Sequence, residues 1–197
     1  LETKLEELID IKHGFAFQGE YFRDEPPGDV LLTPGNFAIG GGFKADKFKF
    51  YNGTVPEDFI LDEGDLLVTM TDLSKAADTL GFPAFIPQHP PACKYLHNQR
   101  LGKVVIKPSA PITKRFLYYL FCTREYRNEV LSSATGTTVM HTSPCRIKIL
   151  GWISSKPSSS FSIHLERVRK RPISSKRGPV DSIISAARLF SPQAKRW

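Results

Sequence analysis

Residues 63–69 read Glu-Gly-Asp-Leu-Leu-Val-Thr, and this stretch decides the fold class. Gly64 and Asp65 are turn formers, and a short apolar run follows them. An apolar run of this length next to a turn is typical of a buried strand, which is predicted over 66–68. Similar short runs stand on both sides of it, separated by Gly, Pro, Asn and Asp. A sheet of short strands with long connections is therefore expected. Its other strands are predicted near residues 30–32, 48–50, 82–86 and 100–107.

Helices are predicted at three places around this sheet. Residues 113–132 carry the strongest helical periodicity, with Thr113 as the N-cap. Residues 3–11 predict a short amphipathic helix, in which Thr3 and Glu6 would form a capping box. Ser143-Pro144 has the pattern of an N-cap followed by a first-turn proline, and so predicts the start of another helix. The sequence thus mixes helices with short strands.

Charge is distributed unevenly along the chain. The 197 residues carry a net charge of +7, but residues 1–97 have a net charge of −8 and residues 98–197 one of +15. A basic half of this kind attracts nucleic acid, an acidic protein or an anionic membrane surface. Composition alone leaves these three partners open.

Membrane insertion and secretion are not indicated. No apolar run approaches the roughly 18 residues that cross a bilayer. The first residues are acidic and lack the apolar segment of a secretory signal. Three cysteines at wide spacing fit reduced thiols better than a disulfide framework. A cytoplasmic protein without membrane contact is expected.

Motifs with catalytic chemistry are not recognisable. The segment 35–40 begins and ends with glycine as a phosphate-binding loop does, but Gly41 and Gly42 follow where Lys and Ser or Thr are needed. His89, Cys93 and His97 recur every four residues, yet the two prolines at 90–91 forbid the helix that would align them on a metal ion. We therefore expect no enzyme activity, no cofactor and no metal site.

The C-terminal part differs in composition from the rest. Residues 154–197 contain 11 serines and 4 prolines and show neither helical nor strand periodicity. Such a segment offers little apolar surface to offset the entropy lost on ordering. The sequence predicts one domain over 1–150 and a basic, poorly ordered tail over 151–197 that does not fold independently.

Three polar segments are candidates for contact with DNA. In residues 44–50 lysines interleave with aromatics, which fits phosphate contact or simply an edge strand with a solvated face. Residues 97–100, His-Asn-Gln-Arg, offer the amide and guanidinium groups that read adenine and guanine, although Asn98 and Gln99 could equally tie down a buried loop. Residues 135–138, Thr-Gly-Thr-Thr, suit backbone approach, phosphate contact or helix capping. The candidate DNA-binding residues are Lys44, Lys47, Lys49, Asn98, Gln99, Arg100, Thr135, Gly136, Thr137, Thr138 and His141.

These segments occur in an order that resembles the target recognition domain of type I restriction-modification specificity subunits. The resemblance rests on an ordered set of pieces, each weak by itself. They are the opening Leu-Ile-Asp-Ile-Lys-His-Gly-Phe-Ala-Phe at 8–17, the Gly-Asp-hydrophobic strand at 63–69, Asn-Gln-Arg-Leu at 98–101, and the Gly-Thr to Ser-Pro segment at 134–144.

The resemblance implies a mixed α/β domain with a strongly twisted, largely antiparallel sheet. It also implies a non-catalytic component that recognises one half of a bipartite DNA site, while separate methyltransferase and restriction subunits carry out the chemistry. Double-stranded DNA and those subunits are the partners that follow. The paired spacer helices of a full specificity subunit are not seen here, and a truncated or out-of-frame tail is the expected explanation. The alternative is an assembly-defective remnant that folds and binds DNA without sequence preference.

Overall fold

The computed structural model describes residues 2–72, 74, 76–136, 139–148 and 153–154. By its contacts the chain divides into two compact units, and the unit Thr3–Ile153 is the one described below. The predicted tail at 151–197 lies outside the described residues except for Ile153 and Ser154, as do Thr137 and Thr138. The boundary near residue 150 therefore stays a prediction.

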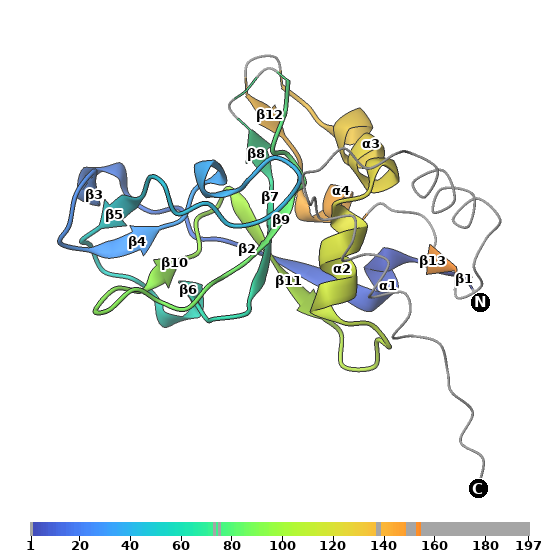
Figure 1. Ribbon diagram of the computed structural model, residues 1–197, viewed down its shortest axis with the longest axis horizontal. Coiled ribbons are helices and arrows are strands. Elements are labelled where there is room, and N and C mark those ends of the chain that lie inside the picture. Colours follow the sequence, from blue (N-terminus) through green and yellow to red (C-terminus); the bar gives the residue numbers. More distant parts are fainter. Residues whose placement is uncertain (1, 73, 75, 137–138, 149–152, 155–197) are drawn as a thin grey trace, which may run out of the picture. The chain divides into compact units, whose positions relative to one another are not determined.

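A four-stranded antiparallel sheet forms the centre of this unit (Figure 1). Its strand order is β2-β11-β7-β9, and each neighbouring pair is antiparallel. Every residue of β7 is buried, because this sheet is covered on both of its faces. The bounds are β2 Ile9–His13, β7 Leu66–Thr69, β9 Pro83–Phe85 and β11 Leu101–Ile106.

A second sheet of five short strands has the order β3-β5-β4-β10-β6, in which only the β4–β10 pair is parallel. A two-stranded arm, β8 with β12, leaves the end of β7. The bounds are β3 Phe22–Arg23, β4 Asp29–Leu31, β5 Lys49–Tyr51, β6 Ile60–Leu61, β8 Thr71–Asp72, β10 Tyr95–Leu96 and β12 Met140–His141; β1 is Glu2–Thr3 and β13 is Ile153–Ser154.

Helices cover one face of the four-stranded sheet and the second sheet packs on the other (Figure 1). Leu66 and Val68 of β7 pack with Leu117 and Phe121 of α2, whereas Leu67 between them packs toward the second sheet. This alternation is the two-residue period of a strand. The α-helices are α1 Leu5–Leu8, α2 Lys114–Phe121, α3 Arg124–Ser133 and α4 Pro144–Ile147, and the 3-10 turns are η1 Gly19–Tyr21, η2 Pro34–Asn36 and η3 Glu57–Phe59.

The first predicted helix was too long. Only Leu5–Leu8 is helical, and it begins after Lys4 without a side-chain cap, so the capping box of Thr3 and Glu6 is wrong. Residues from Ile9 onward form β2 instead, because Ile9–His13 pair with residues 102–106 of β11. Burial of Leu5 and Leu8 nevertheless places α1 in the core.

The long predicted helix is two helices. Thr113 caps the first as predicted, by accepting a hydrogen bond from the Phe116 backbone N–H at 3.2 Å. The helix then stops at Cys122, and Thr123 caps α3 by accepting from the Tyr126 N–H at 3.3 Å. A second N-cap in mid-segment thus turns the chain while both helices keep their apolar faces on the sheet. Strand β10 lies in the long connection expected between the strands predicted at 82–86 and 100–107.

The mixed α/β class with largely antiparallel sheets of short strands is confirmed. In the four-stranded sheet all three pairs are antiparallel, and in the five-stranded sheet one pair of four is parallel. Ser143 and Pro144 open α4 as predicted, but this helix spans only four residues.

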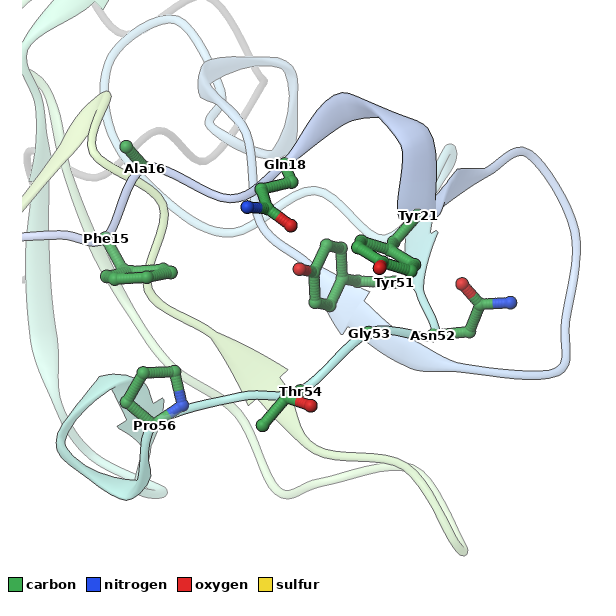
Figure 2. A pocket seen from close by; sticks show the side chains of 9 residues that line it. All are labelled: Phe15, Ala16, Gln18, Tyr21, Tyr51, Asn52, Gly53, Thr54 and Pro56. Atoms are coloured by element: carbon green, nitrogen blue, oxygen red, sulfur yellow. The ribbon is translucent and has the colours of Figure 1, made fainter.

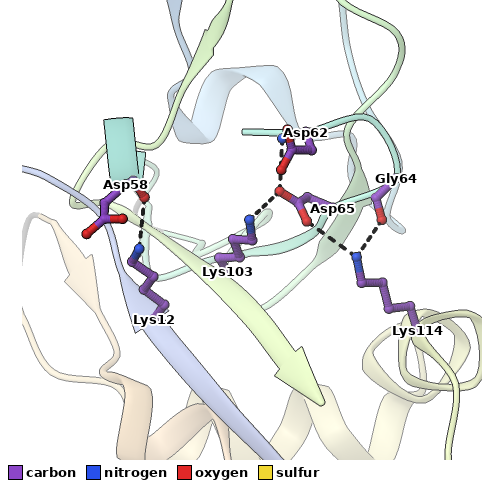
Figure 3. Close-up of polar contacts among 7 residues, drawn as sticks. All are labelled: Lys12, Asp58, Asp62, Gly64, Asp65, Lys103 and Lys114. Carbon is purple, nitrogen blue, oxygen red and sulfur yellow. Dashed lines mark hydrogen bonds and ion pairs between the residues drawn. The ribbon is translucent and has the colours of Figure 1, made fainter. Parts of the chain in front are cut away.

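A buried carboxylate ties the turn before β7 to its neighbours (Figure 3). Asp65 forms ion pairs with Lys103 of β11 and with Lys114 of α2, the latter at 3.3 Å, and it accepts the backbone N–H of Asp62 at 3.0 Å. Burial raises the pKa of Asp65, but Lys103, the Asp62 N–H and Lys114 outweigh it, so the pKa lies below its ordinary value. The turn is thereby fixed to the sheet and to the helix.

Replacement of Asp65 with Asn is expected to lower the free energy of unfolding by about 2 kcal/mol, since hydrogen bonds to charged partners are lost at a site with little water. Urea unfolding followed by circular dichroism measures this. Asp46→Asn is the matched control, because Asp46 is exposed and forms an ion pair with Lys44 alone among the residues that the structure describes. The control should keep the midpoint of the parent chain, and equal midpoints for both variants would contradict the role given to Asp65.

Candidate nucleic-acid interface

The segment Asn98–Arg100 forms a tight turn that leads into β11. The Gln99 N–H donates to the Phe15 carbonyl at 2.9 Å, and the Leu101 N–H donates to the Asn98 carbonyl at 3.0 Å. Gln99 and Arg100 are exposed at this turn, whereas Asn98 is buried. The two side chains free to meet a ligand are therefore those of Gln99 and Arg100.

Asn98 has a structural task in this turn. Its Oδ1 accepts the backbone N–H of Arg100 at 3.1 Å, and its own backbone pairs with Phe15. Close approach of the two segments is possible because residue 14 is glycine: a Cβ there would lie 2.1 Å from the Asn98 carbonyl oxygen. These contacts support the loop-tie interpretation of Asn98, and they position Arg100 for whatever it contacts.

The segment around Thr135 and His141 lies at the same end of the sheet. Thr135 and His141 exchange backbone hydrogen bonds at 3.0 and 2.8 Å, and His141 pairs with Thr71 in the arm formed by β8 and β12. Gly136 turns between them with a φ of +120°, and a Cβ there would lie 2.0 Å from the Val139 carbonyl oxygen. This crowding explains why glycine occupies position 136 without any appeal to contact with DNA.

Met70 joins these two candidate segments. Its N–H donates to the Arg100 carbonyl at 2.9 Å, and its carbonyl accepts the Thr142 N–H at 2.9 Å. The exposed Gln99–Arg100 turn and the His141 arm are therefore neighbours at the end of β7, although they are far apart in sequence. Figure 1 shows the arm projecting from that end of the central sheet.

The lysine segment is held elsewhere, around η2. The Asn36 side-chain amide donates to the carbonyls of Lys44 at 3.3 Å and Lys47 at 2.8 Å. Both lysine side chains are exposed, and Lys44 pairs with Asp46 at 3.2 Å. Lys49 pairs with Asp24 on the second sheet. The structure thus joins two of the three predicted segments and leaves the third at a separate place.

Arg146 was missed by the sequence analysis. Its guanidinium donates to the Thr135 hydroxyl at 3.3 Å, which adds a cation to the His141 arm. Arg127, by contrast, is occupied: it stacks 4.0 Å from the centre of the Phe82 ring and donates to the Ala77 carbonyl. The only sequence signal for Arg146 was its place two residues after Pro144, in the short helix that follows the arm.

Two buried polar groups stabilise this end of the sheet. Burial raises the pKa of Asp72, but hydrogen bonds from Ser74 and Thr79 outweigh it and lower the pKa below its ordinary value. His97, just before the turn, is fully buried; its Nε2–H donates to the Leu101 carbonyl at 2.9 Å, and its Nδ1 has no hydrogen-bond partner among the described residues. Burial lowers the pKa of His97 to about 4. The ring is therefore neutral at physiological pH.

Among the described residues, no three His, Cys, Asp or Glu side chains are grouped to hold a metal ion. His89 instead accepts the Tyr95 N–H at 3.1 Å and stacks on the Tyr95 ring. No helix within the described residues has the length and apolar character needed to cross a membrane.

Comparison with known proteins gives a curated relative that is a specificity subunit. No family model matches the chain. The type I restriction enzyme EcoBI specificity subunit of Escherichia coli is 24% identical over 143 residues, which are 73% of this chain and 26% of that protein. The chain thus spans about a quarter of the length of this curated relative.

Solved structures of similar fold also come from type I restriction-modification systems. The type I restriction-modification S subunit from M. genitalium matches with a TM-score of 0.50 and 14% identity, over 96% of this chain and 43% of that one. A chain from a structure on complex assembly and conformational transition of the type I R-M system matches with a TM-score of 0.52 and 13% identity, over 96% and 41%. The resemblance predicted from the sequence is confirmed: in sequence and in fold, this chain is similar to the specificity subunits of type I restriction-modification systems.

Proposed function

We propose that this chain binds DNA in a sequence-specific manner as the specificity component of a type I restriction-modification complex, and that it reads one half of a bipartite site. The observation that carries the proposal is its likeness in sequence to a specificity subunit over 73% of its length. The uneven distribution of charge also supports DNA binding, since residues 98–197 carry a net charge of +15. A domain of this kind acts inside the cell, on DNA in the cytoplasm.

The base-reading residues are proposed to lie on the Gln99–Arg100 turn and the neighbouring His141 arm. Both side chains of the turn are exposed, and a bidentate arginine is the commonest reader of guanine in the major groove. Arg146 and Thr135, which are hydrogen-bonded to each other beside the arm, would contact phosphates. Lys44, Lys47 and Lys49, at their separate site, would contact the phosphate backbone further along the duplex.

Arg100→Ala is expected to weaken binding to the chain's own target by about 1–3 kcal/mol and binding to random duplex by little, if Arg100 reads a base. The target is first selected from a pool of random duplexes with the full chain. Arg115→Ala, another exposed arginine but on α2, is the matched control. Equal losses on target and random DNA would make Arg100 a phosphate contact, and a pool without enriched sequences would contradict sequence-specific recognition.

Binding to duplex DNA is expected to fall steeply as salt concentration rises. Each phosphate neutralised by a lysine or arginine contributes about −0.9 to the slope of log binding constant against log salt. Fluorescence anisotropy with a labelled duplex between low and moderate salt measures this slope. A binding constant that does not change with salt would contradict an interface made by the basic half of the chain.

The chain is proposed to be non-catalytic and to act with methyltransferase and restriction subunits. The alternative is a remnant that folds, fails to assemble and binds DNA without preference. Co-expression with a methyltransferase subunit and size-exclusion chromatography distinguish the two. A stable complex supports the proposed role, whereas salt-sensitive DNA binding without a complex or an enriched target supports the remnant.

A further inference from the structure

An open pocket of about 550 Å³ lies at the edge of the second sheet, between the segment that follows β2 and the segment that follows β5 (Figure 2). This volume is within the range of sites that hold small groups. Neither segment contains a candidate DNA-binding residue. The pocket is lined by Phe15, Ala16, Gln18, Tyr21, Tyr51, Asn52, Gly53, Thr54 and Pro56.

Aromatic rings form the walls of the pocket. Figure 2 shows the Phe15 ring on one side and the rings of Tyr51 and Tyr21 on the other. Phe17 packs edge-on against both Phe15 and Tyr51, with centroids 5.1 and 4.8 Å apart, so the walls are connected behind the opening. Tyr51 is buried and therefore fixed. Tyr51 and Phe17 thus belong to the core of the second sheet, whereas the Tyr21 ring is exposed.

Glycine at position 53 allows the tyrosines to close over the backbone. A Cβ there would lie 2.6 Å from the Tyr51 hydroxyl and 2.8 Å from the Tyr21 ring. The Asn52 N–H also donates to the Tyr21 carbonyl at 3.3 Å, which holds the two segments together. In Figure 2 the Gln18 amide points into the space between the walls, so an acceptor and a donor are available there.

Negative charge surrounds this pocket. Segments 15–25 and 51–62 carry six acids and one base between them. Two lysines from outside these segments contact them, Lys49 by an ion pair with Asp24 and Lys12 by a hydrogen bond to the Asp58 carbonyl, so the acids remain in excess. Glu20 and Glu57 stand next to the lining residues Tyr21 and Pro56 in the chain, both are exposed, and neither forms an ion pair with any described residue. A DNA backbone would be repelled here, whereas a cation would be attracted.

We propose that the pocket receives an arginine side chain of a partner protein. A guanidinium is planar and weakly hydrated, stacks on aromatic rings, and has five N–H donors for amide oxygens such as those of Gln18 and Asn52. The proposal rests on the proposed function in one respect: if the chain acts in a restriction-modification complex, the partner is another subunit of that complex. Because the Phe15 carbonyl accepts the Gln99 N–H at 2.9 Å, the partner's arginine would lie next to the proposed DNA-reading turn.

The test uses the full ¹⁵N-labelled chain and L-argininamide as the probe, followed by two-dimensional NMR. The amide signals of Gln18, Asn52 and Gly53 should shift with argininamide. L-citrullinamide, which keeps the α-amine and nearly the same shape but has a neutral urea group in place of the guanidinium, should leave them in place. Tyr21→Leu should weaken argininamide binding about two- to fivefold, as expected for an exposed cation–π contact, and Tyr21→Phe should retain it.

Charge is tested with the double variant Glu20→Gln, Glu57→Gln, for which weaker binding is expected. Glu129→Gln, an exposed carboxylate on α3, is the control and should bind as the parent chain does. Equal shifts with citrullinamide, no shift with any probe, or shifts with adenosine monophosphate alone would overturn the proposal; the last would make the pocket a nucleobase site. Selection of a DNA target is an independent assay, so loss of DNA recognition with intact argininamide binding would refute the proposed function and not the pocket.

Discussion

Gly14→Ala is expected to lower the free energy of unfolding by about 3 kcal/mol, the upper part of the range for overpacking a close contact. The new Cβ would lie 2.1 Å from the carbonyl oxygen and 2.3 Å from the carbonyl carbon of Asn98. Both are backbone atoms, so a side-chain rotation cannot relieve the clash. The hydrogen bonds of Phe15 to His97 and of Gln99 to Phe15, each 2.9 Å, would have to lengthen.

Chemical unfolding followed by circular dichroism measures this loss. Gly19→Ala is the matched control, because nothing lies within 4 Å of a Cβ at that position. The control should match the parent chain or be slightly more stable, since alanine restricts the unfolded chain. A Gly14→Ala variant as stable as the control would show that the Asn98–Arg100 turn tolerates displacement. The same variant should also lose target recognition, because Arg100 is positioned by this turn.

Acidification is expected to destabilise the fold through His97. Burial lowers the pKa of His97 from 6.5 to about 4, so the unfolded chain binds the proton more tightly than the folded one. The contribution of His97 to the free energy of unfolding is therefore fully present above pH 6.5. It is lost progressively as the pH drops from 6.5 to 4, and below pH 4 His97 causes no further change. The loss relative to pH 7 is about 2 kcal/mol at pH 5 and about 3 kcal/mol at pH 4.

The physical reason is the state of the two ring nitrogens. Nε2 is satisfied by the Leu101 carbonyl, but a proton on the buried Nδ1 would have no acceptor. Lys103 and Lys12 also disfavour a positive charge on the ring. Urea unfolding at pH 7 and pH 5 measures the difference, and His97→Gln should abolish most of it at the cost of some stability at pH 7. An unchanged difference between pH 7 and pH 5 in His97→Gln would assign the effect to other groups.

Locally encoded elements were predictable from the sequence. The strand at Leu66–Thr69 follows a Gly-Asp turn, and the start of α2 depends on a hydrogen bond between Thr113 and a residue three positions later. Such signals act within one turn of the chain, so they are visible without the fold. The mixed α/β class followed from them, together with the resemblance to specificity subunits.

The tertiary structure decided what depends on distant partners. Tyr95–Leu96 has no periodicity of its own and is a strand only because it pairs with Val30–Leu31 and Ile60–Leu61. The helix expected through residue 11 ends at Leu8, because the next residues complete a ladder with β11.

In the candidate site, too, the sequence indicated the residue types and the tertiary structure decided their surroundings. Amides and an arginine at 98–100 were visible in the sequence, but both interpretations of Asn98 fitted its chemistry. In the structure the backbone of Asn98 lies against Gly14, the Asn98 side chain is buried, and the Arg100 side chain is exposed. The aromatic pocket had no sequence signal, because Phe15, Tyr21 and Tyr51 come from segments that meet only when the second sheet forms. Residue types could thus be read along the chain, whereas burial and neighbourhood were set by long-range packing.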